Sequence, residues 1–350
     1  MKRSKIHKIS TKILFIVLIF TSYFSLLPEA QGQENNKILA KDVKAVKMKK
    51  VPKPKKTIRI LYWNIQNGMW SDQANEYDNF VKWVKKYNPD VCVWCEASSI
   101  YYDYTYKTEP DSLRNLPKRW PEVAKRYGHP YTALGGWRDN YPQEVTSKYP
   151  IKTLLKITDT DNPAKPITHG AAVQQVDVNG MKLNFVTLHT WPQSYGFGVK
   201  AADRNASSAN HDGDYYREYE IDYIISHTIK SPEFKDEQNW IMLGDFNSRS
   251  RADNSEYGYA DDDTRFLCQD KVRSASGLID AVKEKDPDNF HTSTYGKSRI
   301  DYIYVSEPIM SRVTNAHIIM DDWTEPIVSY YEHYFKVPSD HRPILMDIKL

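Results

Sequence analysis

Six short segments of the chain each place a polar, metal-binding or proton-carrying residue beside an apolar run of the kind that forms a strand. They cover residues 63–68, 94–96, 188–191, 244–247, 299–302 and 339–343. Their spread constrains the fold, because distant strands must bring their ends to one place if these residues act together. The segments supply carboxylates, amides and two histidines, which are the groups needed for metal-assisted attack on a phosphoester.

The stretches between these segments predict an α/β architecture. Residues 58–64 alternate between apolar and polar, and residues 90–96 form a nearly continuous apolar run, as expected for strands. Asn179 and Gly180 separate two alternating runs, which is the strongest short-range signal for a hairpin. Helices are predicted over residues 75–86, 121–127 and 214–230, and further strands over residues 240–243, 300–305, 312–319 and 344–348. Residues 192–213 and 249–265 are predicted to be long polar loops that frame the substrate.

The polar residues of the six segments are expected to meet at one edge of the sheets. Four of them follow strands, namely Asn64, Glu96, His189 and Asp245. The others, Asp301 and the neighbours Asp340 and His341, lie where strands begin. Because antiparallel neighbours place the end of one strand beside the beginning of the next, all of them can lie in one cleft of mixed sheets with helices outside.

The first 32 residues have the form of a secretory signal peptide. Five basic residues within positions 2–12 precede an apolar run at 13–20, and the small residues Ala30 and Gly32 occupy the −3 and −1 positions of a cleavage site. We therefore expect cleavage after Gly32 and export to the periplasm or the extracellular space. The alternative is an uncleaved anchor, for which the apolar run is short.

Residues 33–56 are expected to be a solvated, Lys-rich linker, because nine lysines fall between positions 37 and 56. The alternative is an electrostatic tether to an anionic surface or polyanion. Fourteen of the 48 basic residues and three of the 45 acidic ones precede Thr57, which leaves 34 and 42 in residues 57–350 and a net charge of −8. This acidic catalytic domain argues against tight, salt-dependent binding of duplex DNA, which needs clustered Lys and Arg.

The three cysteines do not suggest a disulfide framework. Cys92 and Cys95 lie three residues apart in one apolar strand, so they are expected to point to opposite faces and not to pair. Buried, unpaired thiols are the expected outcome.

At the six segments the chain resembles the endonuclease/exonuclease/phosphatase superfamily. This superfamily includes DNase I-like nucleases, abasic-site endonucleases, neutral sphingomyelinases and inositol-polyphosphate phosphatases. Residues 244–247 (Gly-Asp-Phe-Asn) match its GDFN motif, and residues 339–343 (Ser-Asp-His-Arg-Pro) resemble its terminal SDHxP motif. The resemblance covers residues 57–350 and implies a four-layer α/β sandwich, in which two mixed β-sheets pack face to face between outer helices.

The resemblance also implies which residues act. A divalent cation, Mg²⁺ or Mn²⁺, is expected beside Asn64, Glu96 and Asp340, because such hard cations prefer oxygen ligands. Five catalytic residues are expected. Asp245 orients or deprotonates the attacking water, and Asn247 holds a phosphoryl oxygen. His189 contacts the phosphoryl group, while His341 serves as acid–base or phosphate-binding group and is hydrogen-bonded by Asp301.

Several residues near the expected site keep open roles. The partner of His189 is either Gln143 or Glu144, and His169 either approaches the substrate or is structural. Three aromatic residues are candidates for stacking on a base or another ring, namely Trp70, Trp137 and Tyr195.

We expect an exported, divalent-metal-dependent phosphoester hydrolase, with a nuclease-type phosphodiesterase favoured. One alternative is a sphingomyelinase-like enzyme or a small-molecule phosphatase, although no long exposed apolar hairpin supports the lipid enzyme. The other is a non-catalytic binding module, which would show losses in the motifs. We expect a monomer with no obligatory protein partner, acting on a phosphoester substrate for which nucleic acid is one candidate. The substrate itself is expected to be set by loops outside these motifs.

Overall fold

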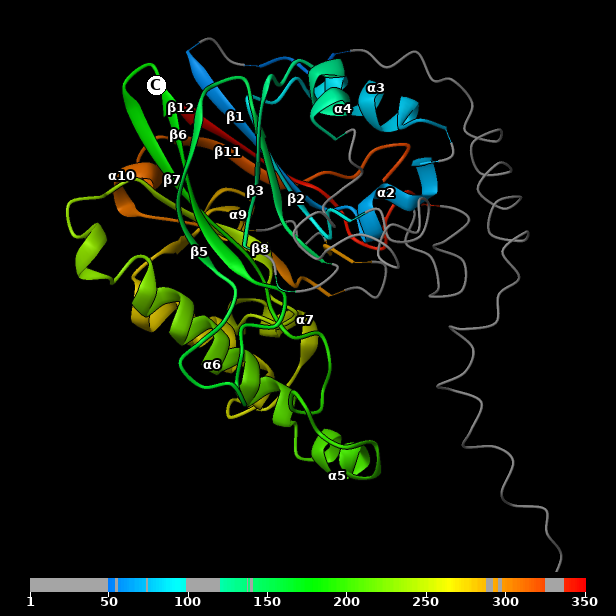
Figure 1. Cartoon of the computed structure of the whole chain (residues 1–350), viewed down its shortest axis with the longest axis vertical. Coiled ribbons are helices and arrows are strands. Elements are labelled where there is room, and N and C mark those ends of the chain that lie inside the picture. Colours follow the sequence, from blue (N-terminus) through cyan, green and yellow to red (C-terminus); the bar gives the residue numbers. More distant parts are fainter. Residues whose placement is uncertain are drawn as a thin grey trace, which may run out of the picture.

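Two six-stranded β-sheets pack face to face, and helices cover their outer faces (Figure 1). The computed structural model describes residues 50–53, 56–73, 75–98, 120–136, 138, 141–287, 292–294, 298–324 and 337–350. The strand order in the first sheet is β11 (Val313–Ile318), β12 (Ile344–Lys349), β1 (Thr57–Asn64), β2 (Val91–Cys95), β4 (Glu144–Ser147) and β3 (Tyr131–Leu134). In the second sheet it is β5 (Ile151–Ile157), β6 (Ala171–Val178), β7 (Met181–His189), β8 (Trp240–Asp245), β10 (Asp301–Val305) and β9 (Ile279–Asp280).

The helices lie outside the sheets or in the loops at their edges. The α-helices are α2 (Gln66–Gln73), α3 (Asp78–Tyr87), α4 (Trp120–Arg126), α5 (Arg204–Ala209), α6 (Asp212–His227), α7 (Asn254–Tyr257), α8 (Leu267–Lys271), α9 (Ala281–Lys285) and α10 (Glu307–Met310). Short 3₁₀ helices are η3 (Ala201–Asp203), η4 (Pro232–Phe234), η5 (Arg251–Asp253) and η6 (Thr264–Phe266), and η7 (Val272–Ser276) is a π-helix.

Alternating side chains divide the core into three layers. On β1, Ile58, Ile60 and Tyr62 point between the sheets, while Leu61 and Trp63 point outward to the layer under α3 and α4. The layer outside the second sheet packs on one face of α6 and contains Ile221, Ile224 and Ile225. In each sheet one neighbouring pair is parallel, β1 with β2 and β7 with β8, so both sheets are mixed. The predicted four-layer sandwich is confirmed.

Local predictions from the sequence are largely confirmed. Asn179 and Gly180 have φ values of 55° and 91°, which suits the tight turn between β6 and β7. Cys92 and Cys95 lie on opposite faces of β2, in different layers of the core, and both are unpaired thiols.

Two predictions about loops are wrong. Residues 192–213 and 249–265, expected to be long loops, contain η3 and α5 in the first case and η5 and α7 in the second. Their polar composition hid short helices of three to six residues, too short to show a hydrophobic period.

The chain enters the domain at the edge where β1 begins. Arg59 on β1 forms a buried bidentate pair with Asp347, which lies directly opposite on β12. The same guanidinium donates to the carbonyls of Val51 and Pro52, and Lys53 pairs with Asp90. Residues 51–53, shortly before β1, are therefore fixed to the domain.

Among the described residues, no helix is long and apolar enough to cross a membrane. The predicted signal peptide at residues 1–32 and most of the predicted linker lie outside the described residues.

We predict that breaking the buried pair of Arg59 and Asp347 costs far more stability than breaking an exposed pair. In Asp347→Asn the buried guanidinium loses its counter-charge, and the expected loss is about 3–5 kcal/mol in the free energy of unfolding. Asp222→Asn removes an exposed contact with Lys271 and should cost little. Urea unfolding of both variants measures the difference, and similar midpoints would contradict the prediction.

Candidate active site

Strand register brings the predicted residues of the second sheet side by side. His189 ends β7 and lies opposite Asp245, which ends the parallel strand β8. Asp245 in turn lies opposite Asp301, the first residue of antiparallel β10. In the first sheet, Asn64 ends β1 opposite Cys95, the residue before Glu96. The expected meeting of strand ends and beginnings at one edge is what the structure shows.

One carboxylate oxygen, Oδ2 of Asp245, lies at the centre of this group. The Asn64 amide donates to it across the two sheets at 3.1 Å. The Nε2 atoms of His189 and His341 each lie 3.7 Å from it. The other oxygen of Asp245 accepts the backbone N–H of Asn247 at 2.8 Å, so the carboxylate is held in one orientation.

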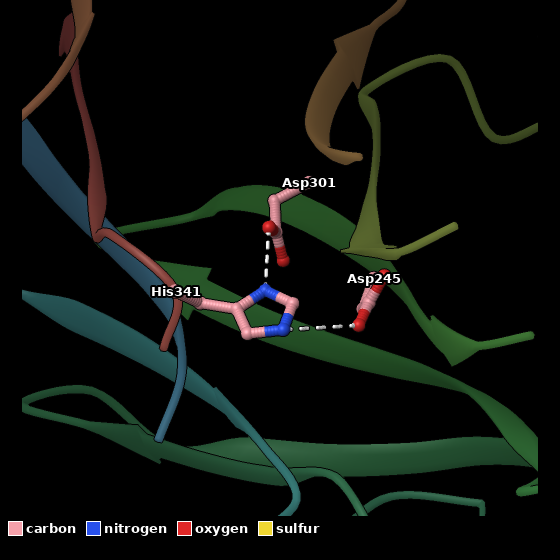
Figure 2. Close-up of side chains that lie close together, drawn as sticks. All are labelled: Asp245, Asp301 and His341. Carbon is pink, nitrogen blue, oxygen red and sulfur yellow. Dashed lines mark hydrogen bonds and ion pairs between the residues drawn. The ribbon is translucent and has the colours of Figure 1, made fainter. Parts of the chain in front are cut away.

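His341 is held between two carboxylates, as Figure 2 shows. Its Nδ1 lies 2.8 Å from Oδ2 of Asp301, so that its Nε2 faces Asp245. The second oxygen of Asp301 accepts the Tyr62 hydroxyl at 2.8 Å. Asp301 and Tyr62 are fully buried, and together they connect the second sheet to the first.

The first sheet supplies a partly exposed carboxylate, Glu96. One of its oxygens accepts the Asn64 amide at 3.3 Å and the other accepts the backbone N–H of Asn67 at 3.0 Å. Its own carbonyl accepts the N–H of Gly68, which is possible because Glu96 has a φ of 56°. A left-handed conformation is unfavourable for Glu and is often found where a side chain is aimed at a functional site.

The last predicted segment is fixed to the end of β1. The Ser339 hydroxyl donates to the carbonyl of Asn64 at 2.7 Å and accepts the N–H of His341 at 3.1 Å. Asp340, between them, has an oxygen 3.9 Å from Nε2 of His341. All eight predicted site residues are thus joined by contacts: Asn64, Glu96, His189, Asp245, Asn247, Asp301, Asp340 and His341.

Burial and neighbouring charges shift the pKa values of the two imidazoles, those of His189 and His341, in opposite directions. Burial alone would lower the pKa of His341, but the neighbouring carboxylates, first of all Asp301, raise it well above its usual range. Burial lowers the pKa of His189 well below its usual range, and the positive charge of His169 adds to this. Burial, reinforced by Asp301, raises the pKa of Asp245 to about 7. A charged and a neutral imidazole therefore face a carboxyl that is able to take up a proton near neutral pH.

The glycine of the GDFN motif has a different role from the one its position at a strand exit suggests. A Cβ on Gly244 would lie 2.1 Å from the carbonyl oxygen of Leu188, so glycine is required for β7 and β8 to pair. The turn is made instead by Asn247, with a φ of 46°. Its amide donates to the carbonyl of Thr190 at 3.0 Å, which uses one of the two amide hydrogens.

Neither residue proposed as the partner of His189 bonds its imidazole. The Gln143 amide donates weakly to the carbonyls of Tyr141 and His169, and Glu144 lies opposite Trp94, whose side chain packs outside the sheet. Instead the ring of His169 packs against that of His189 at a tilt of 35°, with 4.2 Å between centroids, and the Tyr141 ring lies edge-on to both. His169 therefore belongs to the site.

Two site residues were missed by reasoning from the sequence. Tyr62 precedes Asn64 by two positions, so strand alternation already placed both side chains on one face. Tyr141 follows no periodic pattern and carried no signal. Of the aromatic candidates, Tyr195 packs against Trp191 and Arg204, while Trp137 and the side chain of Trp70 lie outside the description.

Two groups of side chains at the edge have the chemistry to hold a metal. Ligand atoms of Asp245, Asp301 and His341 lie within 4.8 Å of one another. In this trio, however, both oxygens of Asp301 already accept hydrogen bonds. Glu96 accepts hydrogen bonds from amides and, among the described residues, pairs with no cation. Glu96 with its neighbours is therefore the better site for a divalent cation.

A search for similar sequences finds no curated protein that matches the chain. The profile of the endonuclease/exonuclease/phosphatase family, in contrast, matches residues 61–341, which is most of the chain.

Solved structures show the same fold at low sequence identity. An AP endonuclease from Archaeoglobus fulgidus is 12% identical with a TM-score of 0.52, over 84% of this chain and 100% of that one. An endonuclease/exonuclease/phosphatase from Beutenbergia cavernae is 15% identical with a TM-score of 0.54, over 85% and 72%. The 3′ phosphatase NExo from Neisseria, bound to product DNA hairpin, is 14% identical with a TM-score of 0.52, over 84% and 100%.

The profile match covers far more than half of the chain, and the solved structures agree with it in fold. The chain therefore belongs to the endonuclease/exonuclease/phosphatase family of phosphoester hydrolases.

Proposed function

We propose that this chain is an exported, divalent-metal-dependent phosphodiesterase that acts on nucleic acid. The observation that carries the proposal is the position of Asp245, whose Oδ2 faces the Nε2 atoms of both His189 and His341 at 3.7 Å. The carboxylate can accept a proton from water, and the two imidazole nitrogens beside it can donate hydrogen bonds to phosphoryl oxygens. A purely binding role would not need this arrangement.

Glu96, Asn64 and Asp340 are the residues that would hold Mg²⁺ or Mn²⁺. Glu96 supplies a carboxylate and Asn64 an amide beside it, while Asp340 is brought to the same edge by Ser339. When bound, such a cation neutralises charge that develops on phosphoryl and leaving oxygens. Oxygen ligands with few carboxylates are what Mg²⁺ sites typically use.

The remaining residues have roles in moving protons and holding the phosphoryl group. Asp245 takes the proton of the attacking water, because its pKa of about 7 matches that task. His341, kept charged by Asp301, donates to a phosphoryl oxygen and strengthens that bond as negative charge develops. The neutral His189 and the second amide hydrogen of Asn247 complete the set of donors.

Nucleic acid is favoured among phosphoesters by the neighbours in fold. An AP endonuclease and a DNA-bound 3′ phosphatase share the fold of this chain, which supports a nucleic-acid substrate. Hydrolysis of DNA, RNA, sphingomyelin, inositol phosphates and bis(p-nitrophenyl) phosphate, each with and without Mg²⁺, tests the proposal. Turnover of sphingomyelin or inositol phosphates alone would overturn the nuclease assignment.

Removal of metal should abolish hydrolysis, and Glu96 should be the residue that binds it. Activity is expected to disappear in EDTA and to return with Mg²⁺ or Mn²⁺. In Glu96→Gln the affinity for Mn²⁺, measured by calorimetry, should fall about 100-fold or more, since loss of a partner outside the coordination sphere alone costs about 10–100-fold. Glu218→Gln, a change on the outer helix α6, serves as control, and full activity of Glu96→Gln in EDTA would contradict the assignment.

Asp301 and His341 should behave as one unit. Asp301→Asn removes the carboxylate that orients the imidazole, so it should reproduce much of the defect of His341→Ala, each costing roughly 10²–10⁴ in kcat. The double variant should be little worse than the worse single one. Melting temperatures recorded alongside kcat exclude simple unfolding. Fully multiplicative losses would show that the two residues act independently.

Export is proposed from the sequence of the first 32 residues. The mature chain should begin near Gln33, because Ala30 and Gly32 precede that point as in a cleavage site. N-terminal sequencing of the protein recovered from outside the cytoplasm measures this directly. A mature, membrane-free protein that begins at Met1 would refute it.

A further inference from the structure

The loop that follows the GDFN motif carries an arginine, Arg249, that pairs with no carboxylate among the described residues. Among the described arginines at positions 249–265, Arg251 pairs with Asp270 and Arg265 with Asp263. Arg249 forms no ion pair with a described residue. It donates from Nη2 to the Ser298 hydroxyl at 3.0 Å, and its buried Nε has no hydrogen-bond partner in the described part of the chain.

Aromatic rings keep the Arg249 guanidinium in place. It lies 5.8 Å from the ring centroids of both Tyr257 and Tyr259, which are stacked on each other at 5.4 Å. Arg265 covers Tyr259 at 3.5 Å, and the Tyr257 hydroxyl accepts the backbone N–H of Arg299. The ring faces are occupied by these neighbours, so the tyrosines hold the arginine and are not free to stack on a base.

Arg249 also lies at the edge of the catalytic group. It follows Asn247 by two residues, which places their Cα atoms at most roughly 7 Å apart. Its hydrogen-bond partner Ser298 belongs to the loop that positions Asp301 and His341. In that loop the Ser293 hydroxyl donates to the carbonyl of Ser298 and accepts the N–H of Asp301. Thr294 forms an isolated antiparallel β-bridge with His341.

We propose that Arg249 forms a subsite for a second phosphate, adjacent to the phosphoester that is cleaved. The proposal rests on the proposed function and extends it to the substrate beyond the reacting group. A guanidinium that is held in place and forms no ion pair with a described residue is well suited to a phosphate oxygen. Residues 57–350 carry a net charge of −8, so a local cation beside the site is needed to place a second anion there.

The proposed Arg249 subsite favours phosphoester substrates that carry a second phosphate. A polynucleotide or a polyphosphorylated small molecule carries the second phosphate that Arg249 would bind. A choline headgroup would instead bring a positive charge toward this arginine, which is unfavourable. The stronger candidate is the neighbouring phosphate of one nucleic-acid strand, because its spacing is fixed and it accompanies every internal phosphodiester.

Binding measured in EDTA tests the subsite without relying on catalysis. Anisotropy of a fluorescein-labelled single-stranded DNA 10-mer should show a Kd about tenfold higher for Arg249→Gln than for the unchanged chain, as expected for one charge-assisted hydrogen bond. The slope of log Kd against log salt should fall by about one. Arg249→Lys should recover part of the affinity. Arg251→Gln removes the same charge from a paired arginine and is the matched control.

Catalytic assays separate this proposal from the proposed function. With Mg²⁺, Arg249→Gln should lose at least tenfold more turnover of the oligonucleotide than of bis(p-nitrophenyl) phosphate, which has one phosphate only. Equal losses on both substrates, or equal weakening of DNA binding by Arg249→Gln and Arg251→Gln, would overturn the subsite. A chain that cleaves neither substrate would refute the proposed function, while the anisotropy comparison would still decide the subsite. Displacement of the labelled DNA by inositol hexakisphosphate at a much lower concentration than by unlabelled DNA, with that difference lost in Arg249→Gln, would assign the second phosphate to a small polyphosphate.

Discussion

The arrangement of the site depends on one buried carboxylate, that of Asp301. It accepts a hydrogen bond from Tyr62 in the first sheet and holds the imidazole of His341. It also stands directly opposite Asp245 in the second sheet. A buried carboxylate is costly unless its oxygens are satisfied, so each of these contacts depends on the sandwich being closed at this edge. A substitution that removes one of these contacts therefore affects both the stability of this sheet edge and the charge and orientation of the His341 imidazole.

Much of this site could be predicted because short motifs mark strand ends, and strand ends must meet at sheet edges. The eight predicted residues are joined in the structure for that reason. The surroundings of His189 could not be predicted, because Gln143 and Glu144 differ by one position and one position reverses the face of a strand. The role of Gly244 could not be predicted either, since a close approach between two distant strands leaves no trace in the local sequence.

The parts of the fold that the sequence described least well are those next to the site. The segments expected as loops after β7 and β8 contain helices α5 and α7, which place Arg204 on Tyr195 and Tyr257 beneath Arg249. Short polar helices of this kind are stabilised by contacts of their own side chains, not by a hydrophobic face. Because function resides in sites placed on the fold, these segments beside the site are also the ones suited to select the substrate.

The chain enters and leaves the domain on the side away from the site. Thr57 begins β1 and Asn64 ends it, so roughly 23 Å of strand separates the entry point from the catalytic edge. The last residue, Leu350, bonds the carbonyl of Lys56, which places the C-terminal end at the same entry point. A surface that contacts the domain beside Thr57 and Leu350 therefore leaves the catalytic edge facing outward. A domain in that orientation would draw substrate from the surrounding solution, and a carrier fused after Leu350 would leave the site open.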